Sequence, residues 1–131
     1  MHTLEIGFED GAIPEPHEIS TALFLSKLGK EITFLAPKNQ PGVKTPDITM
    51  DGKKWEIKAP VSAGSRSIEH AFRAAMKQSP NIIFDLRSSK ASDQTNLARL
   101  KYTFRLVKGK KVGRLLVITK DQQLIDISTT I

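Results

Sequence analysis

The dipeptide Asp51-Gly52 constrains the fold of this chain more than any other feature of the sequence. It lies between two β-rich runs in the segment 45–60, and an Asp-Gly pair in that setting is a strong signal for a two-residue β-hairpin turn. A two-residue loop also fixes the register of the two strands. The predicted pairs are Met50 with Lys53, Thr49 with Lys54, Ile48 with Trp55, and Asp47 with Glu56.

This register separates the hairpin into an apolar face and a polar face, because successive side chains of a strand point to opposite sides. The apolar face is predicted to be core and carries Ile48, Met50, Trp55 and Ile57. The polar face carries Asp47, Thr49, Lys54, Glu56 and Lys58.

The polar face has the composition of a metal-dependent hydrolytic site. Like charges directly opposite one another destabilise a sheet, so the predicted Asp47–Glu56 pair needs a compensating partner. A divalent cation would compensate, and carboxylates completed by a backbone carbonyl and water suit Mg²⁺ or Mn²⁺. Lys58 lies on the same face, where an ammonium group can orient a water or stabilise charge on a phosphate. A lone Glu-x-Lys usually only decorates a solvated strand, but the opposed Asp47 favours a functional site.

The rest of the chain predicts one α/β domain with a mixed central β-sheet flanked by helices, spanning residues 1–131. Helices are expected at residues 17–28, from Ser65 or Ser67 to just before Pro80, and at 92–107. Further strands are expected at 31–35, 81–86, 112–119 and 123–128, and a loop at 37–46.

Composition excludes several classes of protein. The absence of cysteine excludes disulfides, cysteine-based metal sites and thiol nucleophiles. No apolar run approaches the length of a membrane span, and no signal peptide is visible at the start.

The net charge of +6 is unevenly distributed, and this asymmetry indicates a polyanion-binding surface. Residues 1–60 carry 7 Lys and Arg against 9 Asp and Glu, whereas residues 61–131 carry 13 against 5. A basic region of this kind is typical of nucleic-acid binding, although it also occurs as an ordinary solvated face. The candidate nucleic-acid-binding residues are Arg99, Lys101, Arg105, Lys108, Lys110 and Lys111.

Two segments resemble known nucleases. Pro46-Asp47, followed after eight residues by Glu56-Ile57-Lys58, resembles the PD-(D/E)xK signature of the restriction-endonuclease-like superfamily. The segments 45–60 and 77–83 are more narrowly similar to the C-terminal tRNase toxin domains of contact-dependent growth-inhibition (CdiA-type) proteins.

The resemblance implies a restriction-endonuclease-like fold and assigns roles to particular residues. Asp47 and Glu56 would be metal ligands, with the Ile57 carbonyl as a third, and Lys58 would be the catalytic lysine. Glu18, on the first helix, would support the metal site or hold a second ion. Gln78 matches an auxiliary polar position on the helix after the motif.

The expected function is therefore Mg²⁺- or Mn²⁺-dependent cleavage of nucleic acid. The toxin resemblance favours tRNA as substrate, with DNA as the second candidate, and implies action in the cytoplasm after delivery as the C-terminal module of a secreted toxin. Other interpretations remain open: a non-catalytic basic nucleic-acid-binding module, an interaction protein that docks an acidic partner such as an immunity protein, or a metal-independent RNase.

Overall fold

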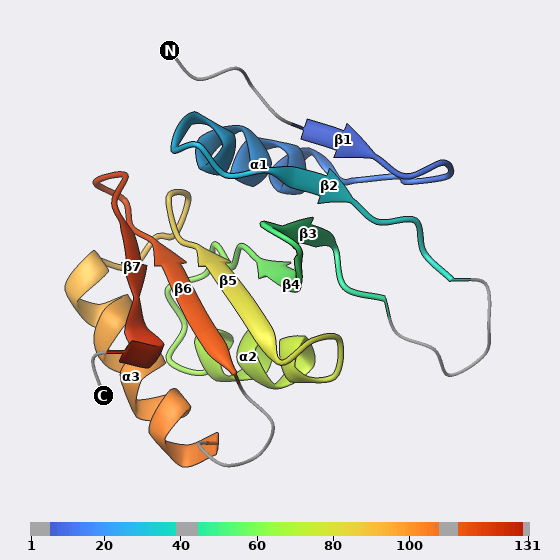
Figure 1. Ribbon diagram of the computed structural model, residues 1–131. Coiled ribbons are helices and arrows are strands. Elements are labelled where there is room, and N and C mark those ends of the chain that lie inside the picture. The colour runs from blue at the N-terminus through green and yellow to red at the C-terminus, as the bar shows by residue number, and fades with distance from the viewer. Residues whose placement is uncertain (1–5, 39–44, 108–112, 130–131) are drawn as a thin grey trace.

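The structure is a computed structural model that describes residues 6–38, 45–107 and 113–129. Helices follow β1, β4 and β5, whereas β2, β3 and β4 follow one another directly, as do β6 and β7 (Figure 1). In chain order they are β1 (Ile6–Phe8), α1 (Pro16–Lys27), β2 (Ile32–Phe34), β3 (Ile48–Met50), β4 (Lys53–Lys58), α2 (Ser67–Met76), β5 (Asn81–Asp85), α3 (Asp93–Val107), β6 (Arg114–Ile118), β7 (Leu124–Asp126) and the 3₁₀ helix η1 (Ile127–Thr129).

The strands form one seven-stranded sheet in the order β1-β2-β3-β4-β5-β6-β7. The pairs β1–β2, β4–β5 and β5–β6 are parallel, and each of these pairs is connected through a helix. The pairs β2–β3, β3–β4 and β6–β7 are antiparallel. The predicted mixed α/β architecture with flanking helices is confirmed.

Helices cover both faces of the sheet and create two apolar cores (Figure 1). On one face, α2 and α3 pack through residues such as Phe72 and Leu100 against β5 and β6. On the other face, α1 packs through Ala22 and Leu25 against β2, β3 and β4. Trp55, fully buried in the second core, anchors β4 to that face.

The hairpin forms with the predicted register. Met50 pairs with Lys53, Thr49 with Lys54, and Ile48 with Trp55. The turn places Asp51 at φ 50° and Gly52 at φ 84°, which is the left-handed backbone that an Asp-Gly turn provides. The four residues of the predicted apolar face are all buried.

Strand β1 was not predicted from the sequence. It is only three residues long, pairs with β2 alone, and contains a glycine that gives no alternating pattern. A Cβ on Gly7 would come within 3.3 Å of the Thr33 hydroxyl, so the glycine permits the close approach of β1 to β2. Such a short strand depends on its neighbour more than on its own propensity.

Candidate active site

The predicted metal-ligating and catalytic residues gather at one end of the central strands. Three segments meet there: the chain entering β3, the end of β4, and the first turn of α1. The antiparallel hairpin brings Asp47, just before β3, next to the last residues of β4. Glu18 comes from α1, which begins at the same end of the sheet, so three carboxylates reach one region from separate elements.

Asp47 is held by backbone hydrogen bonds on both sides. Its N–H donates to the Trp55 carbonyl (3.1 Å), and its Oδ2 accepts from the Ile57 N–H (2.8 Å). The regular register ends at Ile48–Trp55, so Asp47 and Ile48 both lie opposite Trp55, as in a β-bulge. The predicted direct pairing of Asp47 with Glu56 is therefore wrong in its backbone detail, because the bulge displaces Asp47 by one position.

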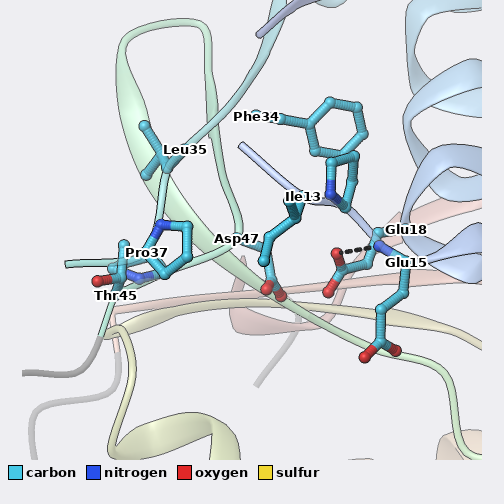
Figure 2. Close-up of a pocket in the computed structure, with 10 residues that line it drawn as sticks. Ile13, Glu15, Glu18, Phe34, Leu35, Pro37, Thr45 and Asp47 are labelled. Atoms are coloured by element: carbon cyan, nitrogen blue, oxygen red, sulfur yellow. Dashed lines mark hydrogen bonds between the residues drawn. The ribbon is translucent and has the colours of Figure 1, made fainter. Parts of the chain in front are cut away.

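Glu18 is fixed by the start of α1. Its Oε1 accepts a hydrogen bond from the Glu15 N–H (3.0 Å), which satisfies a backbone donor that helix geometry leaves unpaired. Pro16 occupies the first turn, where its missing N–H costs nothing. Figure 2 shows the carboxylates of Glu18 and Asp47 turned toward the same space, with the Glu15–Glu18 hydrogen bond beside them.

Glu56 is buried, with only 4% of the residue exposed, although the sequence pattern places it on a polar face. Its Oε2 lies 3.5 Å from the Nζ of Lys58, which shares the same face of β4. Its Oε1 is buried and has no hydrogen-bond partner among the described residues. A buried carboxylate oxygen without a partner is costly, so this oxygen is available to a proton or to a bound ligand.

All three carboxyl groups have raised pKa values. Burial is the largest cause in each case. The pKa of Glu18 rises to about 7, with a further contribution from the charge of Asp47. The pKa of Asp47 rises to about 6, with a further contribution from Glu56. The pKa of Glu56 is also raised, although Lys58 opposes the shift. Desolvated carboxylates that repel one another are typical of functional sites.

The donor set fits a hard divalent cation that keeps part of its water shell. Among residues 6–38, 45–107 and 113–129, no group of three or more His, Cys, Asp or Glu side chains is arranged to hold a metal ion, so Glu18, Asp47 and Glu56 do not form a three-residue metal site. Mg²⁺ does not need a complete protein cage, because it usually binds through one or two carboxylates together with water and substrate phosphate. The unpartnered oxygen of Glu56 and the carboxylate of Asp47 are the groups suited to this role.

Two surface hollows meet at this site. One is lined by Asp47, Pro46 and Phe34 among others, and the second by Glu56, Lys58 and Ala71 among others. Both include Glu15 and Glu18, so Glu18 lines both hollows; Figure 2 shows the first of them. Asp47 therefore lines the first hollow, Glu56 and Lys58 line the second, and Glu18 lines both.

Gln78 does not join this group. The resemblance places it on the helix after the motif, but α2 ends at Met76 and Gln78 follows in the turn that leads to β5. This turn is anchored by Ser79 to the Lys54 carbonyl, at the end of β4 opposite to Lys58. The Oε1 of Gln78 is buried without a partner among the described residues.

The predicted basic surface is described in part. Lys101 and Arg105 are exposed on α3, as expected for a surface that contacts phosphates. Arg99 differs, because its Nη1 donates to the Ala63 carbonyl (3.1 Å) and so braces the loop between β4 and α2. Lys108, Lys110 and Lys111 lie outside the described residues.

Sequence reasoning did not select two charged residues that lie close to the site. Asp85 and Arg87, at the end of β5, line a hollow that adjoins the one holding Lys58. The available signal in the sequence was an aspartate at the end of a buried apolar strand. That signal alone does not reveal that Asp85 accepts a hydrogen bond from Thr21 on α1.

No helix in the described part of the chain combines the length and apolar character needed to cross a bilayer. Comparison with curated proteins gave no match. Among solved structures, the chain is similar to the "CdiA-CT/CdiI toxin and immunity complex from Burkholderia pseudomallei". The two align with a TM-score of 0.67 and 21% identity, over 93% of this chain and 97% of that chain, which supports the fold.

The profile of the family described as "Contact-dependent growth inhibition CdiA C-terminal domain" matches residues 44–124. The matched region runs from the approach to β3 to the first residue of β7, and so includes Asp47, Glu56 and Lys58. Since this is more than half of the chain, the protein belongs to the CdiA C-terminal domain family of contact-dependent growth inhibition.

Proposed function

We propose that this domain is a Mg²⁺- or Mn²⁺-dependent nuclease of the PD-(D/E)xK type, with tRNA as the favoured substrate and DNA as the second candidate. The observation that carries the proposal is the placement of Glu18, Asp47 and Glu56 at one end of the central strands, beside Lys58. Their raised pKa values and the unpartnered Glu56 oxygen indicate a site built for a cation.

Each residue has a role that follows from its position. Asp47 and Glu56 would hold the ion, with the Ile57 carbonyl as a further ligand. When bound, the ion supplies a Lewis acid that polarises a phosphate oxygen and lowers the pKa of a bound water. Lys58, held beside Glu56, would orient the attacking water or stabilise charge that develops on the phosphate.

Glu18 would act as a supporting group for the ion or for its water. Its Oε1 is already engaged by the Glu15 N–H, so the helix start fixes the direction of the carboxylate before substrate arrives. A carboxyl with a pKa of about 7 can also accept or release a proton near neutral pH.

The basic surface would bind the substrate backbone. Lys101 and Arg105 are exposed, and Lys108, Lys110 and Lys111 follow directly in the sequence. Contacts of this type hold phosphates without reading bases, so they support a polynucleotide substrate but do not separate RNA from DNA. The preference for tRNA rests on the similarity of segments 45–60 and 77–83 to tRNase toxin domains.

An immunity protein is the proposed protein partner. The similar structure from Burkholderia pseudomallei is described as a toxin and immunity complex. Because this chain carries a net charge of +6, we expect its partner to be acidic. We further propose that the domain is delivered by a secreted protein and acts in the cytoplasm of the target cell.

The test is cleavage of total tRNA and of linear plasmid DNA by purified protein with Mg²⁺, Mn²⁺ or EDTA. Glu56→Gln and Lys58→Ala should abolish cleavage. Lys54→Ala is the matched control, because Lys54 lies on the same face of β4 but is exposed at its other end. Metal-dependent tRNA fragments that disappear in both site variants, but not in the control, would support the proposal.

Other outcomes would move or end the proposal. Cleavage of DNA with the same dependence would retain the mechanism and change the substrate. Cleavage in EDTA would contradict the metal mechanism. Binding of tRNA without any cleavage would favour the non-catalytic basic module.

A further inference from the structure

A third hollow lies beside the candidate active site and contains none of the proposed catalytic side chains. It is lined by His17, Ser20, Ala59, Asp85, Arg87 and Ser88. His17 and Ala59 also line the hollow that holds Glu56 and Lys58, so the two hollows adjoin at the same end of the sheet. A strand of substrate that reaches the carboxylates would extend into this neighbouring space.

Arg87 is held in a fixed orientation within this hollow. Its Nε and Nη2 donate to the two carboxylate oxygens of Asp85, at 2.9 and 2.7 Å. Nη2 also donates to the Ser20 hydroxyl (3.2 Å), and the guanidinium carbon lies 4.9 Å from the centre of the Phe24 ring. Contacts from β5 and from α1 therefore position one guanidinium group.

Asp85 is a strong anchor for this arginine. Only 6% of the residue is exposed, and its carboxylate also accepts hydrogen bonds from the Thr21 hydroxyl and the Arg87 N–H. Burial alone would raise the pKa of Asp85, but the bonds from Arg87 and Thr21 lower it. The carboxylate therefore stays ionised and keeps the guanidinium in place.

Arg87 has N–H donors left over for a ligand, in addition to those that connect β5 to α1. A guanidinium has five N–H donors in a planar fork. Asp85 and Ser20 occupy those of Nε and Nη2, whereas Nη1 has no partner in the described part of the chain. The side chain is 24% exposed, so the group is open to the hollow rather than sealed in the core.

We propose that Arg87 binds a second phosphate of the nucleic-acid strand, next to the phosphate that is cut. The planar fork of arginine suits phosphate oxygens, and Ser20 and Ser88 bring hydroxyl groups to the same hollow. The inference rests on the proposed nuclease function and adds a binding subsite to it. By holding the strand on one side of the scissile bond, Arg87 would set the position of that bond over Asp47 and Glu56.

The test compares Arg87→Gln with Arg114→Gln in tRNA binding, measured in EDTA so that no cleavage is required. Arg114 is a matched control because it also pairs with an aspartate, Asp126, but lies at the start of β6, at the opposite end of the strands from Arg87. Both substitutions remove one positive charge. Arg87→Gln should weaken binding about tenfold more than Arg114→Gln, as expected for a charged hydrogen bond.

The salt dependence gives an independent measure. Loss of one phosphate contact should reduce the slope of log affinity against log salt by about 0.7–0.9 in Arg87→Gln. The double variant Asp85→Asn/Arg87→Gln guards against misfolding, since it leaves no unpaired buried carboxylate, and it should show the same loss.

Equal binding by Arg87→Gln and Arg114→Gln would overturn the subsite, even if the wild-type protein cleaves tRNA with Mg²⁺. Conversely, the wild-type protein could cleave neither tRNA nor DNA while Arg87→Gln still weakens tRNA binding more than Arg114→Gln does. That result would overturn the nuclease function and retain the phosphate site. The two failures are therefore distinguishable.

Discussion

Replacing Asp47 with asparagine should make the metal-free protein more stable at neutral pH. The pKa of Asp47 is about 6 in the fold, against an ordinary value of 3.8, because the group is buried and lies near Glu56. The folded state therefore holds the proton more tightly than the unfolded chain. The stability that this proton provides is present below pH 4 and is lost as the pH rises through 6.

The expected magnitude follows from the same pKa values. Each pKa unit corresponds to about 1.4 kcal/mol, so the ionised carboxylate costs the metal-free fold at most about 3 kcal/mol above pH 6. Asp47 is half-buried, and solvent screening reduces the expected cost to about 1–2 kcal/mol. Asparagine has no charge, and its carbonyl oxygen can still accept the hydrogen bond from the Ile57 N–H.

The assay is denaturant unfolding in EDTA at several pH values between 4 and 8. Asp47→Asn should match the wild-type protein at pH 4 and exceed its free energy of unfolding by about 1–2 kcal/mol at pH 8. Asp10→Asn is the control, because Asp10 is exposed in a turn and should show no pH-dependent difference. If Asp47→Asn were equally or less stable than wild type at pH 8, the argument that burial and the nearby Glu56 make the ionised Asp47 costly would be refuted.

Three further predictions follow from the same structure. Mg²⁺ at 100 times its Kd should stabilise the wild-type protein by about 2.7 kcal/mol, which is measured as a raised Tm. Glu56→Gln should lack this rise in Tm, and an equal rise in the variant would mean that the ion binds elsewhere. Phe72→Ala should lower the free energy of unfolding by about 3–5 kcal/mol, because the fully buried ring of Phe72 fills the core between α2 and β5. The measurement is urea unfolding, and a loss below about 1 kcal/mol would contradict this prediction. Gly52→Ala should lower the free energy of unfolding by about 1 kcal/mol, because φ at this position is 84° and alanine is strained there. An unchanged midpoint of urea unfolding would show that the turn relaxes.

The sequence is most informative where local rules are strong. The Asp51-Gly52 turn and the alternation along 48–57 predict the register and the buried face of the hairpin correctly. The helices also lie within two residues of their expected starts wherever one start was assigned, since caps and apolar periodicity are local signals. The grouping of Glu18 with Asp47 was implied only by the resemblance, because it depends on how α1 packs against the sheet.

Features that depend on tertiary contacts were not predictable in the same way. The bulge at Asp47 replaces ladder pairing by a bond to Trp55, and no local pattern marks it. The burial of Glu56 results from its position in the sheet beside the hollow near Ala71, although alternation alone predicts an exposed residue. The partnership of Asp85 with Thr21 joins residues 64 positions apart. Each is a long-range arrangement for which sequence spacing carries no signal.

The strand order has a consequence for how the domain can assemble. Every strand of the sheet pairs with the next strand along the chain, so no strand is inserted between two that formed earlier. A chain that folds from one end to the other can therefore add each new strand to the edge strand of the sheet already formed. No existing strand pair has to separate. Connections between sequential neighbours also keep loop-closure costs low and favour rapid folding. A domain with this topology is suited to refold after it has been unfolded and passed through a narrow channel as an extended chain.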